Sequence, residues 1–108
     1  MTSRGSKPIV LLGDALDLLR AFPDAARKEA GVQLHKVQLG LPPSDWKPMP
    51  TVGPGVVEIR IHDKAGAFRV LFVADRADAV YVLHAFQKKT PRTAKHDLAL
   101  ATQRLKQI

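Results

Sequence analysis

The sequence contains no cysteine, a single tryptophan, a single tyrosine and no long apolar run. Without cysteine the protein has no disulfide, no thiolate ligand for a metal and no cysteine nucleophile, a composition that suits a reducing compartment. None of the apolar runs approaches the ~18 residues needed to cross a bilayer, and the first residues lack the apolar stretch of a secretory signal. We therefore expect a cytoplasmic protein that has no membrane partner.

The sequence signatures of cofactor and metal chemistry are also missing. There is no GxxxxGK[ST] phosphate loop and no GxGxxG turn, and the four histidines show no HExxH or other tight ligand spacing. No serine lies in a nucleophile-elbow context, and no close pair of carboxylates suggests glycoside hydrolysis. We expect no cofactor and no metal, which leaves acid–base and electrostatic chemistry by Arg, Lys, His and Glu.

What the chain does have is positive charge. Its 108 residues include 17 Lys and Arg against 10 Asp and Glu, a formal net charge of +7. Such a charge attracts polyanions, so nucleic acid or the ribosome is the favoured partner; the alternative is that the charge serves solubility or faces an acidic protein. The length fits one domain over residues 1–108, in which we expect residues 1–6 to be flexible.

The spacing of apolar residues predicts an α+β fold with the element order β-α-α-β-β-β-α. A short strand over Ile9 to Leu12 is followed by a helix that Asp14 caps and Pro23 ends. A second helix carries an apolar stripe that runs from Ala26 to Leu41. These elements form the N-terminal half of the predicted domain.

The second half is predicted to be mostly sheet. Residues 40–55 hold five prolines and three glycines, which predicts an irregular connection. Strands are then expected over 56–62, 67–74 and 80–86, and the tight turns between them favour an antiparallel meander with the middle strand in the centre. A last helix, capped by Thr93, is expected to pack its apolar stripe on the sheet.

Charged residues fall at particular places on this predicted sheet. Period two puts Glu58 and Arg60 on one face of the first long strand, and Arg69 is the only charge in the middle strand. Lys88 and Lys89 follow at the end of the third. We expect one face to be apolar beneath the helices and the opposite face to gather these cations around one carboxylate, an arrangement that fits a phosphodiester.

Each of these residues also has a structural explanation. Glu58 and Arg60 could be an ordinary solvated pair, and the two lysines could mark a solvated strand end. Arg69, which lies among apolar neighbours, either forms an ion pair with Glu58 or binds an anionic ligand. His84 shares its strand parity with Val82, so a hydrogen-bonded core histidine is at least as compatible with the pattern as a catalytic one.

Five stretches resemble the phage-derived, HigB-like branch of the RelE/ParE toxin superfamily: KPIVLLGDALDLLRAFP, GVQLHKVQLGLPPSDWKPM, VEIRI, GAFRVLFVA and AVYVLHAFQKKT. The resemblance extends from Lys7 to Leu105. It implies a small RelE-like fold, a mainly antiparallel twisted sheet backed by helices, and the toxin half of a type II toxin–antitoxin pair. Such toxins are typically endoribonucleases that cleave mRNA in the ribosomal A site. Their partner is an antitoxin encoded next door, often a helix-turn-helix protein.

The resemblance also implies roles for individual residues. Arg69 resembles the family arginine that contacts the scissile phosphate, and Arg60 and the Lys88–Lys89 pair fall where members place basic site residues. Glu58 is matched in position. The candidate catalytic residues are Arg69, Arg60, Lys88, Lys89, Glu58 and His84, and the candidate RNA-binding residues are Arg92 and Lys95.

One departure from the family pattern concerns proton transfer. Some ribosome-dependent members carry a catalytic tyrosine near the C-terminus, whereas this chain has no aromatic residue after Phe86. If the chain cleaves RNA, Lys88 or Lys89 would act as base or acid, with Glu58 and His84 as competitors. Two other functions stay open: a ParE-like poison of DNA gyrase, and a degenerate toxin that acts as a non-catalytic partner-binding module.

Overall fold

The chain forms a five-stranded mixed sheet with helices on both faces, in a computed structural model that describes residues 6–108. The strands are β1 (Ile9–Leu11), β2 (Trp46–Pro48), β3 (Val56–Asp63), β4 (Gly66–Val73) and β5 (Val80–Lys88), and the helices are α1 (Ala15–Arg20), α2 (Asp24–Gln38) and α3 (Lys95–Leu105). The α+β prediction is confirmed, with one strand added to the predicted order. Flexibility was expected for residues 1–6, of which residues 1–5 lie outside the part of the chain that the structure describes.

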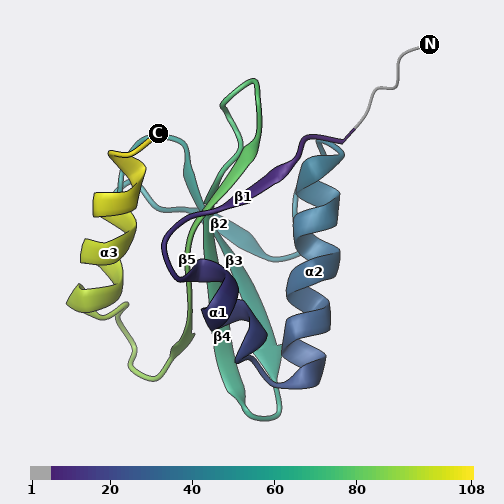
Figure 1. Ribbon diagram of the computed structural model, residues 1–108. Coiled ribbons are helices and arrows are strands. Elements are labelled where there is room, and N and C mark those ends of the chain that lie inside the picture. The colour runs from purple at the N-terminus through teal and green to yellow at the C-terminus, as the bar shows by residue number, and fades with distance from the viewer. Residues whose placement is uncertain (1–5) are drawn as a thin grey trace.

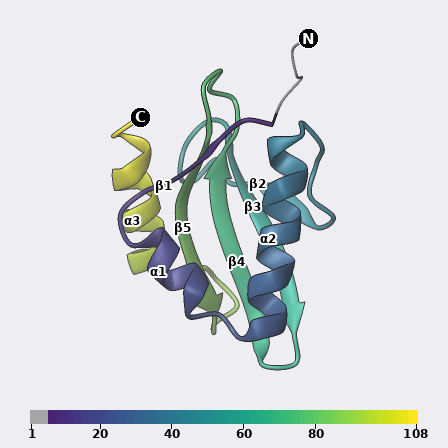
Figure 2. The ribbon, with the colours of Figure 1, turned by 45° about the vertical axis from the view of Figure 1, so that its right-hand side comes forward.

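The helices cover both faces of the sheet. Figure 1 views the sheet from its β1 edge, with α3 on one side and α2 on the other, and Figure 2 shows α1 on the side of α2. Leu19, Leu34 and Phe72 belong to the apolar cluster beneath α1 and α2, whereas Leu71 and Ala101 belong to a second cluster beneath α3. The expectation that the helices share one face is wrong, because β4 presents apolar side chains to both faces and each needs a cover.

The three long strands form the predicted antiparallel meander, with β4 in the centre of the strand order β1-β5-β4-β3-β2. A bulge interrupts the last pairing, because Leu71 lies opposite His84 whereas Phe72 lies opposite Val82. The extra residue, Leu83, packs beneath α3, while Val82 packs beneath α1 and α2. Val82 and His84 therefore do not share a face, although strict alternation predicts that they do.

The added strand, β2, lies inside the connection 40–55, which was predicted to be irregular. It pairs antiparallel with β3 at one edge of the sheet, with Trp46 opposite Ile59 and Pro48 opposite Val57. A proline has no N–H to donate and is tolerated in a strand mainly at a sheet edge. The edge position of β2 is thus the reason why a proline-rich segment could still form a strand.

The helix ends differ from the predictions in detail. α2 ends at Gln38, so Leu41 lies beyond it and is exposed. The N-cap of α3 is Ala94, one residue after the predicted Thr93. Asp14 does occupy the N-cap of α1, but its side chain makes no capping hydrogen bond there.

The Asp14 carboxylate instead connects the N-terminal loop to α3. Arg104 Nη2 donates to Asp14 Oδ1 at 2.6 Å, and Arg104 Nη1 donates to the carbonyl oxygen of Leu83 on β5 at 3.0 Å. Gly13 has a φ of +54°, and a Cβ at this position would lie 2.5 Å from the Arg104 guanidinium. Glycine at position 13 therefore allows both the left-handed turn and the close approach of Arg104.

We predict that this link stabilises the fold in a pH-dependent way. The hydrogen bond from Arg104 lowers the pKa of Asp14, so the carboxylate stabilises the folded state above its unfolded pKa and loses this effect as the pH falls through its folded pKa. Because the Asp14 side chain is 52% exposed, Asp14→Asn should lower the free energy of unfolding at neutral pH by less than about 1 kcal/mol. Urea titrations should show the two proteins converging well below pH ~3.9; a difference that is the same at neutral and acid pH would contradict the prediction.

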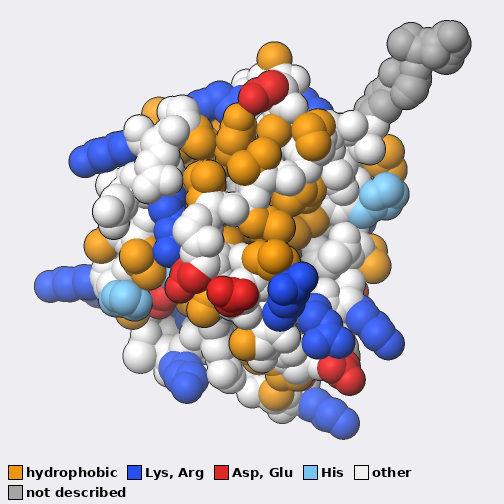
Figure 3. All heavy atoms as spheres, in the orientation of Figure 1, with side chains coloured by type: hydrophobic (Ala, Val, Ile, Leu, Met, Phe, Trp, Pro, Cys, Tyr) orange, Lys and Arg blue, Asp and Glu red, His pale blue; other side chains and the backbone are white. Residues whose placement is uncertain are grey.

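Apolar and basic side chains occupy different parts of the surface (Figure 3). Figure 3 shows apolar side chains gathered near the middle of the face over β1, with Lys and Arg side chains projecting on the sides of α2 and α3. None of the helices within residues 6–108 is long and apolar enough to cross a membrane.

Candidate functional site

The register of the three long strands arranges the predicted site residues in rows on one face of the sheet. Arg60 on β3 lies opposite Arg69 on β4, and Arg69 lies opposite Phe86 on β5. The neighbouring rows are Glu58–Leu71–His84 on one side and His62–Ala67–Lys88 on the other. The expected gathering of Glu58, Arg60 and Arg69 on one face is confirmed, and this face is the one that also carries α3.

Glu58 is completely buried between two guanidinium groups. Its Oε1 lies 3.5 Å from Nε of Arg60 and 3.5 Å from Nε of Arg69, while the carboxylate oxygens and both Nε atoms have no hydrogen-bond partner within residues 6–108. Glu58 and Arg60 are therefore not an ordinary solvated pair, and Arg69 does form an ion pair with Glu58. Glu58 faces both guanidinium groups, and Arg60, whose side chain is 34% exposed, extends from this buried group to the surface.

Arg69 is held from two sides. Besides the Glu58 carboxylate at Nε, its Nη1 donates a hydrogen bond to the carbonyl oxygen of Phe68 at 3.0 Å. The side chain is only 8% exposed. A guanidinium that is already oriented in this way is a preorganised donor, which needs little further reorganisation to interact with an anion.

The end of β5 adds more positive charge next to this row. Lys88 is half-buried, whereas Lys89, Arg92 and Lys95 are exposed. A pocket of about 170 Å³ is lined by Phe86, Lys88, Lys89, Thr90, Arg92 and Asp97, among others. Phe86 belongs both to this pocket and to the row of Arg60 and Arg69, so the two groups of cations adjoin.

His84 is buried and hydrogen-bonded. Its Nε2 lies 2.7 Å from Asp97 Oδ1, and its Nδ1 lies 3.5 Å from Arg104 Nη1. Because arginine can only donate, Nδ1 is the acceptor, and Nε2 then carries the proton that is donated to Asp97. The side chain is 3% exposed, so the geometry favours the hydrogen-bonded core histidine among the two explanations for His84.

Three polar residues near the site were not predicted. Lys47 on β2 lies opposite Glu58, and Asp45 lies 3.4 Å from His62 Nε2 and 4.0 Å from Arg60 Nη1. Both come from the segment whose prolines concealed a strand. Asp97 reaches the pocket from α3, and its spacing of four from the buried Ala101 is the signal that could have placed it on the sheet-facing side.

The only tyrosine of the chain lies at the other end of β5. Its hydroxyl donates a hydrogen bond to Asp78 Oδ2 at 2.7 Å, and this bond to a carboxylate raises the pKa of Tyr81. The phenol therefore stays protonated and engaged at the start of β5, whereas Lys88 lies at the end of the same strand.

A comparison with protein families shows what the chain is similar to. The family model described as "Phage derived protein Gp49-like (DUF891)" matches residues 17–106, which include all the strands except β1 and every candidate site residue. A comparison with curated proteins finds no match.

Proposed function

Because the chain belongs to the Gp49-like family of phage-derived proteins, within the RelE/ParE-like toxin superfamily, we propose that it is the toxin of a type II toxin–antitoxin system, of the HigB-like branch, and cleaves translated mRNA on the ribosome. The family is toxin-like and implies an antitoxin partner. The observation that carries the proposal of cleavage is the row of two guanidinium groups, Arg60 and Arg69, held by a buried Glu58 beside the lysines that end β5.

The proposed reaction is an intramolecular transesterification, in which the phosphoryl group moves from the 5′-oxygen of one nucleotide to the 2′-oxygen of the nucleotide before it. A base removes the proton of a ribose 2′-OH, the 2′-oxygen attacks the adjacent phosphorus, and the bond from phosphorus to the 5′-oxygen breaks. An acid gives a proton to the leaving 5′-oxygen, so the products are a 2′,3′-cyclic phosphate and a 5′-hydroxyl. Arg60 and Arg69 would stabilise the charge that develops on the phosphoryl oxygens, a contribution of about 3–4 kcal/mol for a preorganised donor.

The geometry of the candidate residues supports different tasks for them in this reaction. Glu58 has no exposed surface and lies between two guanidinium groups, which suits holding Arg60 and Arg69 rather than contacting a ribose. His84 is similarly enclosed by Asp97 and Arg104. Lysine side chains at the end of β5 are the candidates for proton transfer that have access to the surface.

We predict that Lys88 contributes more to cleavage than Lys89. Lys88 lies opposite Ala67, two residues before Arg69, and therefore shares the face of the two arginines, whereas Lys89 follows the end of the strand. In single-turnover cleavage of mRNA on purified ribosomes, Lys88→Ala should lower the rate by at least about 100-fold, the lower range for a general acid or base. Lys89→Ala removes the same charge and is the matched control, for which we expect a loss below about 10-fold. Equal losses would contradict this ranking, and a loss below about 10-fold for Lys88→Ala would exclude Lys88 from proton transfer.

The rival functions are separated by which process stops first when the chain is produced in cells. Loss of translation while DNA replication continues supports the ribonuclease. An SOS response with intact mRNA would support a gyrase poison instead, and normal growth with well-expressed, folded protein would support a non-catalytic module.

A further inference from the structure

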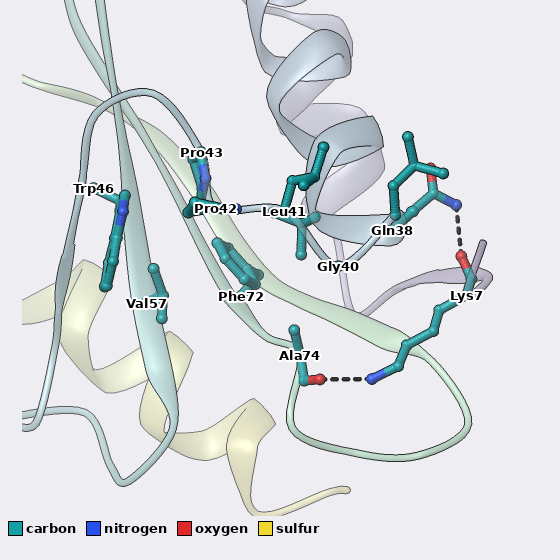
Figure 4. Close-up of a pocket in the computed structure, with 12 residues that line it drawn as sticks. Lys7, Gln38, Gly40, Leu41, Pro42, Pro43, Trp46, Val57, Phe72 and Ala74 are labelled. Atoms are coloured by element: carbon teal, nitrogen blue, oxygen red, sulfur yellow. Dashed lines mark hydrogen bonds between the residues drawn. The ribbon is translucent and has the colours of Figure 1, made fainter. Parts of the chain in front are cut away.

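A large apolar groove lies on the opposite face of the sheet from the two arginines. It has a volume of about 660 Å³ and lies between the C-terminal end of α2, the loop that follows it and the edge of the sheet. Figure 4 shows Phe72 and Val57 on the sheet side of this groove, with Leu41 on the loop and Trp46 at its far end. Val57 and Phe72 are paired neighbours on β3 and β4, and they lie next to the pair Glu58 and Leu71. Because side chains alternate along a strand, Val57 and Phe72 point to the face opposite Glu58.

The groove collects exposed apolar surface. Leu39, Leu41 and Trp46 are 51%, 52% and 43% exposed, and they are three of the five large apolar side chains that are exposed among the described residues. Contiguous exposed apolar surface on a soluble protein commonly marks a site of protein interaction. The exposed residues of the groove therefore point to a protein partner that covers them.

The edge of the sheet beside the groove favours a helix over a strand as the occupant. A strand added to a sheet bonds to free N–H and C=O groups along the edge. β2 is the edge strand here, it has only three residues, and Pro48 has no N–H to donate. An amphipathic helix needs no such backbone bonds and binds by packing its apolar face into a groove.

The charges around the groove favour an acidic helix. No Asp or Glu lines the groove, whereas Lys7 does, and Lys7 donates hydrogen bonds to the carbonyl oxygens of Ala74 and Arg76 without forming an ion pair in the described part of the chain. Lys36, near the C-terminal end of α2, donates a hydrogen bond to Ser44 on the loop that borders the groove. Glu or Asp on the flanks of a bound helix would complement these cations.

We propose that the groove lined by Leu39, Leu41, Trp46, Val57 and Phe72 is the docking site for an acidic amphipathic helix of the antitoxin. The identity of this partner rests on the proposed function. The groove and the Arg60–Arg69 row lie on opposite faces of the sheet, so the helix anchors the antitoxin without itself covering the arginines.

The first test uses Trp46, the only tryptophan of the chain, as a fluorescent reporter. The probe is a synthetic peptide of about 18 residues, long enough to form helix on binding, with Leu at helical spacing on one face and Glu elsewhere. We expect saturable binding with a blue shift of Trp46 emission. Binding should weaken by at least about tenfold in the variant Leu39→Glu/Leu41→Glu, as expected when central apolar anchors are lost.

Matched controls keep this test specific. Leu16→Glu/Val32→Glu makes the same change at two exposed apolar residues outside the groove and should bind the peptide as the wild type does. A peptide of the same composition without an apolar face, and one with Lys in place of Glu, should bind at least about tenfold more weakly. Equal binding by both double variants, or by all three peptides, would overturn the proposal. Self-association that only Leu39→Glu/Leu41→Glu abolishes would overturn it too, because the occupant would then be a second copy of the chain.

The second test concerns the identity of the partner. The antitoxin encoded next to the toxin gene should suppress growth arrest by the wild type and by Leu16→Glu/Val32→Glu, but should fail to suppress arrest by Leu39→Glu/Leu41→Glu. Suppression of all three would overturn the assignment to the antitoxin. The fluorescence test needs no RNA cleavage, so a failure of the groove proposal and a failure of the proposed function are distinguishable.

Discussion

Replacing Arg69 by alanine is expected to lower the single-turnover rate of RNA cleavage by at least about 100-fold, the effect of removing one preorganised donor from a site of developing negative charge. Arg69 is at the centre of the row that contains Arg60 and Phe86, and its guanidinium is fixed by the Glu58 carboxylate and the Phe68 carbonyl. In cells, the same substitution should relieve growth arrest. Growth curves and cleavage on purified ribosomes measure the two effects.

Two variants control for charge and for folding. Arg69→Lys keeps the charge but loses the planar fork that matches a phosphate, so we expect it to recover only part of the activity. Arg76→Ala removes another arginine, one that pairs with Asp75 in the turn between β4 and β5, and should cleave RNA at the wild-type rate. Because Arg69 is buried, far-UV circular dichroism must show that the variant is folded. A folded Arg69→Ala protein that cleaves within about tenfold of the wild type would remove Arg69 from the mechanism.

The second large effect is on stability. Glu58 is fully buried and is the only carboxylate within 4.0 Å of Arg69 in the described residues, so Glu58→Gln leaves the buried Arg69 without a counter-charge and Arg60 with Asp45 alone. Breaking a buried ion pair by removing one partner costs about 3–5 kcal/mol, which should appear as a lower free energy of unfolding in urea titrations. The control is Asp45→Asn, at a half-exposed partner of Arg60, for which we expect a loss below about 1 kcal/mol.

A double variant separates charge from packing. If Glu58 acts by compensating Arg69, the loss of stability in Glu58→Gln/Arg69→Gln should be smaller than the sum of the two single losses, because neither buried charge is then left alone. Strict additivity of the single losses, or a Glu58→Gln protein as stable as the wild type, would show that Glu58 does not stabilise the fold by compensating the charge of Arg69.

The sequence predicted the placement of Glu58, Arg60 and Arg69, for which two local rules were sufficient. Alternation along β3 put Glu58 and Arg60 on one face, and a lone charge in an otherwise apolar strand singled out Arg69. The tight turn between the strands then set the register that makes Arg60 and Arg69 direct neighbours. Each of these steps involves residues that are close in the chain, which is why a single sequence contained the information.

Other features depended on contacts between distant residues. β2 exists because its partner β3 stabilises an edge strand in spite of Pro48, which local propensity counts against a strand. The bulge at Leu83 shifts which residues of β5 face each side of the sheet, and no glycine or proline in β5 indicates its position. Asp97 comes to the site through the packing of α3 on β5, and the partner of His84 could not be inferred from spacing within either element.

The most direct test of the central claim is to induce the wild type and Arg69→Ala in cells without antitoxin and to map the new 5′ ends of mRNA. The account predicts growth arrest with cuts in phase with codons of translated messages, and loss of both with Arg69→Ala. Growth arrest by the wild type without new 5′ ends, or cuts that persist with Arg69→Ala, would contradict it.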